Sequence, residues 1–291
     1  MKPAPFEYHA PESLPEALAL LSELGDEAKV LAGGQSLIPV LALRLTVFAN
    51  LVDIGRIAEL AGIERRNGSL RIGATTTEAA VGADAQVASS VPLLARATPL
   101  IGHFQIRNRG TLGGSIAHAD PAAEYPAVAL TLDATMEVAS PGGRREIAAG
   151  DFFDGLWSTT MAPDEMLTAV RFPVWGGRCG FGVEEFARRH GDFAMAGATV
   201  ALEVDEADKV KRCAIGLIGL GSTPLRAGGA ESAAVGSSAR EIDAAEIGRR
   251  AVDGLESVPA DLHGSASYRR RVGAEMVSRA WAAASKEACG E

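Results

Sequence analysis

Two short turns of the chain contain adjacent glycines, and each turn ends in a hydroxyl residue. The first has the sequence Ala-Gly-Gly-Gln-Ser at residues 32–36, and the second has Thr-Leu-Gly-Gly-Ser at residues 111–115. Paired glycines let the backbone approach a ligand closely and present consecutive N–H groups to an anion. Where such a turn leads into a helix, the first N–H groups of the helix favour the same anion. We therefore predict that a diphosphate lies between the two turns.

Other residues near the second turn allow different chemistry. The spacings G-x-G-x-x-G and G-x-x-x-x-G-K-[ST] are absent from both turns, which excludes the Rossmann and P-loop interpretations. Ser115 lies in Gly-Gly-Ser-Ile-Ala, a near match to the nucleophile elbow G-x-S-x-G, so a serine hydrolase is one alternative. His118 and Asp120 suggest a metal pair, but two ligands do not complete a site. Arg107 and Arg109 are either surface charges or contacts to a bound dinucleotide or neighbouring subunit. A non-catalytic nucleotide-binding module is a further alternative.

The elements around the turns are those that a phosphate cradle requires. Residues 28–32 are short and apolar, which predicts a buried strand running into the first turn, and the apolar stretch after it to Arg44 predicts a helix. Ser13 and Glu16 have the spacing of a capping box before an amphipathic helix that stops at Gly25. A helix over residues 92–101 is expected to lead toward the second turn.

The rest of the pattern predicts a mixed α+β protein of two or three lobes. Short apolar or alternating segments predict strands at residues 51–54 and 69–74 and through the middle third of the chain, whereas residues 237–291 show helical periodicity. A chain of 291 residues exceeds what one core usually serves. Proline and paired glycines at residues 173–177 predict a domain boundary there.

Composition excludes several classes of protein. The 28 basic against 37 acidic residues give a net charge of −9, which disfavours binding to nucleic acid or to an anionic membrane. The longest apolar runs, such as residues 127–132, are too short to span a bilayer, and the first residues lack the apolar core of a signal peptide, so we expect a cytoplasmic protein. The three cysteines form no C-x-x-C, so this chain is not expected to bind an iron–sulfur cluster.

These motifs together resemble a known family. Residues 32–37 followed by Arg44, then Gly-Ala-Thr-Thr at 73–76, then residues 107–121 with both arginines and the second turn, are similar to the FAD-binding medium subunit of the molybdenum hydroxylases, which include carbon monoxide dehydrogenase and xanthine dehydrogenase. Segments 191–194 and 223–227 are similar to the carboxy-terminal domain of the same subunit. The resemblance covers nearly the whole chain.

The resemblance implies an α+β fold with a two-lobed FAD-binding domain of the PCMH type at residues 1–175, with subdomains at about 1–56 and 57–175, and an α+β carboxy-terminal domain at 176–291 with an antiparallel sheet and helices. It implies that both turns wrap the FAD diphosphate through backbone N–H groups, helped by the hydroxyls of Ser36 and Thr111. Ile101 would lie near the adenine, Asp120 or Glu124 would accept hydrogen bonds from ribose or ribityl hydroxyls, and Phe193 would lie near the isoalloxazine. Relatives can carry lysine around residues 184–185, a role that Arg188 could fill here. The predicted cofactor-binding residues are Ala32, Gly33, Gly34, Gln35, Ser36, Leu37, Ile101, Thr111, Leu112, Gly113, Gly114, Ser115, Asp120, Glu124, Arg188 and Phe193.

The function implied by the resemblance is electron transfer within a complex. FAD can accept two electrons together and pass them on singly, which suits a junction between iron–sulfur clusters and an acceptor such as NAD or a quinone. The resemblance implies a small [2Fe–2S] subunit and a large subunit with the molybdenum cofactor, assembled as a dimer of heterotrimers. Gln35 stands where covalent flavoproteins carry the flavin-linking histidine, so the FAD is expected to be non-covalent. The alternatives are a stand-alone FAD-dependent dehydrogenase or oxidase and, more remotely, a serine hydrolase that uses Ser115.

Overall fold

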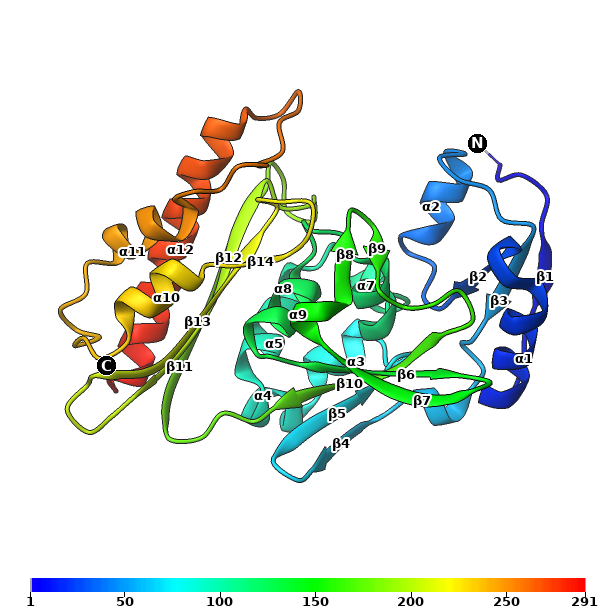
Figure 1. The fold of residues 1–291 in the computed structure, drawn as a ribbon, viewed down its shortest axis with the longest axis horizontal. Helices are drawn as coiled ribbons and strands as arrows, with labels where there is room; N and C mark the ends of the chain where they lie inside the picture. Colours follow the sequence, from blue (N-terminus) through cyan, green and yellow to red (C-terminus); the bar gives the residue numbers. More distant parts are fainter. Residues whose placement is uncertain (1, 291) are drawn as a thin grey trace.

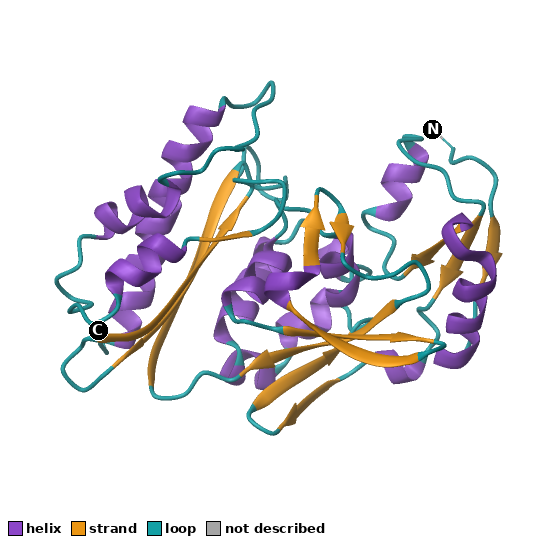
Figure 2. Cartoon of the chain, viewed as in Figure 1, coloured by secondary structure: helices purple, strands orange, loops and turns teal. Residues whose placement is uncertain are grey.

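The computed structural model describes residues 2–290, in which three units follow one another along the chain (Figure 1). A small parallel sheet lies at the amino-terminal end, a five-stranded antiparallel sheet with helices lies in the middle, and a four-stranded antiparallel sheet with a long helix lies at the carboxy-terminal end (Figure 2). This arrangement confirms the predicted α+β class and the antiparallel sheet of the last unit.

The amino-terminal unit carries the first glycine turn between a strand and a helix. Its parallel sheet has the order β1-β3-β2, with β1 (Glu7–His9), β2 (Ala28–Leu31) and β3 (Asn50–Asp53). Its helical segments are α1 (Leu14–Leu24), η1 (Gly25–Glu27), α2 (Leu37–Ala42) and η2 (Ala58–Leu60). Ser13 Oγ accepts the amide of Glu16 at 3.4 Å, as the capping pattern predicts, but the Glu16 carboxylate accepts from Glu12. Helix α2 ends before Arg44, because that residue has a left-handed φ of 55°.

The middle unit is built on an antiparallel sheet of order β4-β5-β10-β6-β7. Its strands are β4 (Ile63–Arg66), β5 (Ser69–Gly73), β6 (Thr135–Ser140), β7 (Gly143–Ala148) and β10 (Met166–Pro173), and a separate hairpin is formed by β8 (Phe153–Gly155) and β9 (Ser158–Thr159). One face of the sheet contributes Leu70, Ile72 and Phe172 to the main core, whereas the alternate residues Arg71 and Arg171 pair with glutamates on the other face. The helices therefore cover one face of the sheet.

Those helices are short and pack together above the sheet (Figure 1). They are α3 (Glu78–Ala83), α4 (Ala85–Ser90), α5 (Pro92–Ala97), η3 (Thr98–Leu100), α6 (Phe104–Arg107), α7 (Leu112–His118), α8 (Glu124–Thr131) and α9 (Ala149–Phe152). The single helix predicted over residues 92–101 is divided into α5 and η3, with Pro99 at the change. Proline lacks the N–H that a continuing α-helix needs, which explains the break.

The sheet of the carboxy-terminal unit packs against the helices of that unit on one face and against the middle unit on the other. The sheet has the order β11-β12-β13-β14, with β11 (Arg178–Phe186), β12 (Ala196–Val204), β13 (Val210–Ile218) and β14 (Leu225–Arg226), and the helices are α10 (Gly228–Ala234), α11 (Ala244–Val252) and α12 (Ala266–Ala288). Val200 and Leu202 pack in the core with α12, and Ala201 joins the main core of the middle unit. The boundary predicted at residues 173–177 lies between β10 and β11. Among residues 2–290, no helix has both the length and the apolar character needed to cross a membrane.

Candidate functional site

The two glycine turns lie against each other, although they are far apart in the sequence. A Cβ atom at Gly33 would overlap the carbonyl oxygen of Arg109 and lie 2.7 Å from the Cα of Gly110. A Cβ atom at Gly114 would lie 3.8 Å from the Cβ of Ala32. Glycine at residue 33 is therefore required by close backbone approach, and the end of β2 meets the start of α7 at this point.

The second turn uses most of its amides to hold itself in place. Thr111 Oγ1 accepts the amide of Gly114 at 3.0 Å, and the amides of Leu112 and Gly113 donate to Thr76 and Ala74 at 3.0 Å. The amide of Ser115 donates to the Thr111 carbonyl at 3.0 Å. This corrects one expectation, because the amides of residues 112–115 are not free to donate to a diphosphate. Within the described chain, the Thr111 amide and the Ser115 hydroxyl of this turn donate no hydrogen bond.

In the first turn, by contrast, the backbone amides are left without partners among the described residues. Among the hydrogen bonds of residues 2–290, none has an amide of residues 33–36 as its donor. The Gln35 side chain donates to the Gly33 carbonyl at 3.1 Å, and the Ile38 amide donates to the Gly34 carbonyl, which fixes the turn from within. Ser36 precedes α2 without capping it, and Leu37 is the first residue of that helix. Four consecutive donors without partners in a fixed turn suit a diphosphate.

Helix α7 leads from the second turn toward Asp120. The helix ends at His118, and Ala119 then takes a left-handed conformation with φ 55°. One carboxylate oxygen of Asp120 accepts the amide of Ala122 at 2.9 Å, and the other accepts the indole N–H of Trp157 at 3.1 Å. Both contacts come from the middle unit, and they hold the Asp120 carboxylate on both of its oxygens.

A cavity of about 650 Å³ begins at Asp120 and opens onto the carboxy-terminal unit. Its lining consists of Asp120, Ala122, Arg188, Gly191, Asp192, Phe193, Ala194, Asp261, His263 and Arg269. Three residues that were predicted from separate parts of the sequence, Asp120, Arg188 and Phe193, therefore share one cavity. The Phe193 side chain is 62% exposed, so it is available to pack against a ligand ring.

The loop that carries Phe193 is held at both sides. Its end is fixed by the Met195 amide, which donates to the Phe186 carbonyl at 2.8 Å. Gly191 lies against the His103 ring, where a Cβ atom would approach the ring to 2.6 Å. Arg188 Nη1 lies 2.9 Å from His263 Nδ1. Sequence reasoning missed His263 and Arg269, because no motif marks the segment that contains them.

Ile101 and Glu124 do not line this cavity. The Ile101 side chain belongs to the main core, and its carbonyl accepts from Arg107 Nη1 at 2.7 Å. Arg107 therefore serves an intramolecular contact in this structure. Glu124 is only 7% exposed at the start of α8. Burial raises the pKa of Glu124 to about 8, and the nearby carboxyls of Glu185, Glu78 and Asp120 add to that shift.

The buried Glu124 leads to a prediction about pH. A carboxyl whose folded-state pKa is raised costs nothing below the unfolded-state pKa. Its destabilisation builds up as the pH rises from the unfolded-state pKa to the folded-state pKa of about 8, and it is constant above that value. We expect the free energy of unfolding of the FAD-free chain to fall from about pH 5 to about pH 9, and Glu124→Gln to remove on the order of 3 kcal/mol of that fall. Urea unfolding at several pH values measures this.

The exposed Glu256 provides the matched control, since Glu256→Gln makes the same chemical change in solvent. That control variant should keep the wild-type pH dependence. If Glu124→Gln shows the same slope as wild type, the Glu124 carboxyl does not carry the destabilisation.

The contacts around Ser115 and His118 do not favour a serine hydrolase or a metal site. The Ser115 hydroxyl has no hydrogen bond to a histidine within the described chain. The His118 ring stacks on Trp157, with centroids 6.0 Å apart and planes 18° apart. Within residues 2–290, no group of three or more His, Cys, Asp and Glu side chains is arranged to hold a metal ion.

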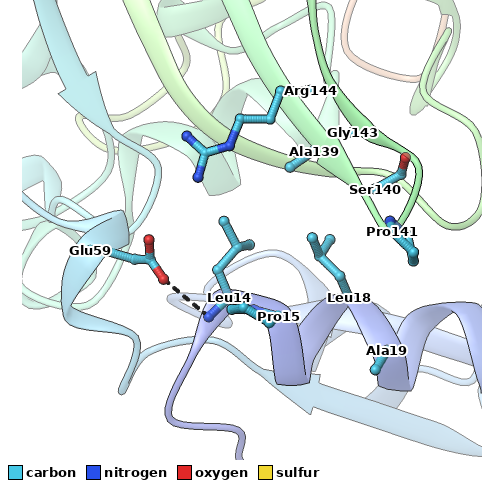
Figure 3. A pocket seen from close by; sticks show the side chains of 10 residues that line it. All are labelled: Leu14, Pro15, Leu18, Ala19, Glu59, Ala139, Ser140, Pro141, Gly143 and Arg144. Atoms are coloured by element: carbon cyan, nitrogen blue, oxygen red, sulfur yellow. Dashed lines mark hydrogen bonds between the residues drawn. The ribbon is translucent and has the colours of Figure 1, made fainter.

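A second hollow, of about 390 Å³, has no residue of the glycine turns in its lining, and Figure 3 shows the residues that line it. Leu14 and Leu18 of α1 face Ala139 and the β6–β7 turn across it, and the Glu59 carboxylate accepts the Leu14 amide at 3.2 Å. None of the predicted site residues lines it. Its largely apolar walls do not suit a diphosphate.

The chain matches two family profiles, several curated relatives and solved structures. A family profile described as "FAD binding domain in molybdopterin dehydrogenase" matches residues 4–175, and one described as "CO dehydrogenase flavoprotein C-terminal domain" matches residues 182–284. The chain is 41% identical to the 6-hydroxypseudooxynicotine dehydrogenase complex subunit alpha of Paenarthrobacter nicotinovorans, over 98% of this chain and 96% of that one. It is 38% identical to the carbon monoxide dehydrogenase medium chain of Hydrogenophaga pseudoflava, over 98% of each. A solved structure of carbon monoxide dehydrogenase from the same organism, which lacks the Mo-pyranopterin moiety, superposes with a TM-score of 0.92 at 39% identity, over 98% of each chain.

Proposed function

Because the chain belongs to the family of FAD-binding medium subunits of molybdenum hydroxylases, which are oxidoreductases, we propose that it binds FAD non-covalently and passes electrons from iron–sulfur clusters of a partner subunit to an external acceptor. The observation that carries the proposal is the first glycine turn. Its four amides at residues 33–36 have no partner within the described chain and lie beside the second turn. That arrangement fits the diphosphate of a dinucleotide.

The residues of this chain would hold the two ends of FAD differently. The amides of residues 33–36, with the Thr111 amide, would bind the diphosphate. Asp120 would accept hydrogen bonds from hydroxyl or N–H groups farther along the cofactor, and Phe193 would pack against the flavin ring in the cavity. Arg188 would add a cation at the same cavity. Gln35 carries no nucleophile toward the cofactor, and its side-chain amide is bonded to Gly33, which supports non-covalent binding.

The bound cofactor supplies the redox chemistry, since FAD takes up two electrons together and releases them singly. The chain contributes binding, orientation and the charges around the flavin. Its three cysteines are Cys179, Cys213 and Cys289, which lie apart as free thiols. An iron–sulfur cluster requires about four thiolates, so the clusters would belong to a partner. We assign to the complex a small [2Fe–2S] subunit and a large molybdopterin subunit, assembled as a dimer of heterotrimers in the cytoplasm.

Isolation of the affinity-tagged chain from the cells that produce it tests the proposal. The expected preparation contains this chain, FAD, iron, molybdenum and two further chains in equal amounts. A yellow preparation of this chain alone that reduces its own flavin with a small substrate would contradict the proposal and favour a stand-alone FAD-dependent dehydrogenase. A preparation without FAD, iron and molybdenum would also contradict it.

A further inference from the structure

Trp157 occupies an unusual position beside the cavity. It lies in the turn of the β8–β9 hairpin, is 50% exposed and has a left-handed φ of 56°. A bulky residue other than glycine adopts this conformation rarely, so the surrounding contacts must hold it there. Two contacts hold the Trp157 side chain in place. Its indole N–H donates to Asp120, and its ring stacks on His118.

These contacts fix the Asp120 carboxylate at the cavity wall. Ala122 binds one of its oxygens and Trp157 binds the other, so the carboxylate cannot rotate without losing a hydrogen bond. Within residues 2–290, no arginine, lysine or histidine forms an ion pair with Asp120. The Asp120 carboxylate is therefore held in one orientation by hydrogen bonds, but no direct ion pair within this range neutralises its negative charge.

His118 stacks on Trp157 and so helps to hold the Trp157–Asp120 contact, without neutralising the negative charge of Asp120. Burial lowers the pKa of His118, and Lys29 acts in the same direction, whereas Asp120 opposes the shift. The imidazole is thereby favoured in its neutral form at neutral pH, when it serves as a flat surface for the indole. The three side chains come from the end of α7, the loop after it and the β8–β9 hairpin, all in the middle unit.

We propose that Trp157 is a positioning residue that, with His118, directs the Asp120 carboxylate toward FAD in the cavity and thereby sets both the affinity for FAD and the reduction potential of the flavin. The inference rests on the proposed function, because it requires FAD in this cavity. A directed negative charge disfavours electron density on a nearby ring, so it lowers the potential. Release of the carboxylate from Trp157 would let it turn toward solvent, which weakens both effects.

The test compares Trp157→Phe with Asp120→Asn and with the control Trp175→Phe. Phenylalanine keeps a ring for His118 but lacks the N–H donor. Trp175 contacts Arg212 and Phe181 and does not line the cavity, so it controls for loss of an indole. The readouts are the dissociation constant for FAD, the midpoint potential of the bound flavin and the melting temperature, measured on the full chain in whichever form binds FAD, alone or with its partner chains.

Trp157→Phe is expected to weaken FAD binding about tenfold, the equivalent of one hydrogen bond to a charged group. It should raise the flavin potential in the same direction as Asp120→Asn, and the double variant should match Asp120→Asn alone, because the two residues act as one unit. A merely structural role would lower the melting temperature and leave the potential unchanged. If wild type and Trp157→Phe bind FAD with equal affinity and potential, this inference fails while the proposed function stands. If wild type binds no FAD in any form, the proposed function itself fails.

Discussion

Replacement of Gly33 by alanine is expected to weaken FAD binding at least about 100-fold. The new Cβ atom would overlap the carbonyl oxygen of Arg109 and lie 2.7 Å from the Cα of Gly110, and both of these are backbone atoms that cannot rotate away. The two turns must then separate, and the amides of residues 33–36 lose their common direction. Loss of two hydrogen bonds to a charged phosphate corresponds to this factor or more. Titration of the purified variant with FAD measures the effect.

Gly150 is the matched control for this substitution. A Cβ atom there would meet nothing within 4 Å, so Gly150→Ala should bind FAD as wild type does. Circular dichroism establishes whether Gly33→Ala is folded. If it is unfolded, Gly34→Ala provides a milder change, because Gly34 has φ 74° and a Cβ atom there would meet only the Ile38 and Leu31 side chains. Folded Gly33→Ala or Gly34→Ala with wild-type affinity for FAD would show that the first turn is not the diphosphate site.

Replacement of Gly180 by valine is expected to unfold the carboxy-terminal unit. A Cβ atom at Gly180 would overlap the Ala284 carbonyl oxygen and approach the Ala288 amide nitrogen to 2.7 Å, so helix α12 could no longer lie on β11. Overpacking against a helix backbone costs more than side-chain repacking, and we expect about 4 kcal/mol or more. Trp281 of α12 is 1% exposed, so its fluorescence reports on this contact.

The matched control is Gly176→Val, in the segment between β10 and β11, where a Cβ atom meets nothing within 4 Å. Urea unfolding followed by tryptophan fluorescence should show an early transition for Gly180→Val only. That variant should also lose FAD, because Phe193 and Arg188 belong to the unit that unfolds. A wild-type unfolding midpoint for Gly180→Val would contradict the packing described for α12 and β11.

The sequence predicted best those features that depend on neighbouring residues. The paired glycines of residues 33–34 and 113–114 mark the two turns directly, and Ser13 marks the start of α1 by local capping. The residue types of the two turns predicted a diphosphate between them, and the resemblance to the family then identified the ligand as FAD. The family itself is confirmed by the two matching profiles.

Features that depend on contacts between distant segments could not be predicted in the same way. The amides of Leu112 and Gly113 were expected to face a ligand, but they pair with the segment after β5, at Thr76 and Ala74. The Trp157 contact to Asp120 joins a hairpin to a loop 37 residues earlier. No local pattern around Trp157 indicates that contact. The individual contacts of the predicted cofactor residues with FAD remain predictions.

The most direct test of the central claim is an absorbance spectrum of the purified chain, alone and with the chains that purify with it, before and after acid precipitation. The account predicts flavin bands in the preparation and transfer of the yellow colour to the supernatant, where FAD is found at one per chain. Flavin that stays with the precipitated protein would contradict non-covalent binding. A folded protein that is colourless and takes up no added FAD, both alone and with its partner chains, would contradict the assignment of the two glycine turns as a FAD site.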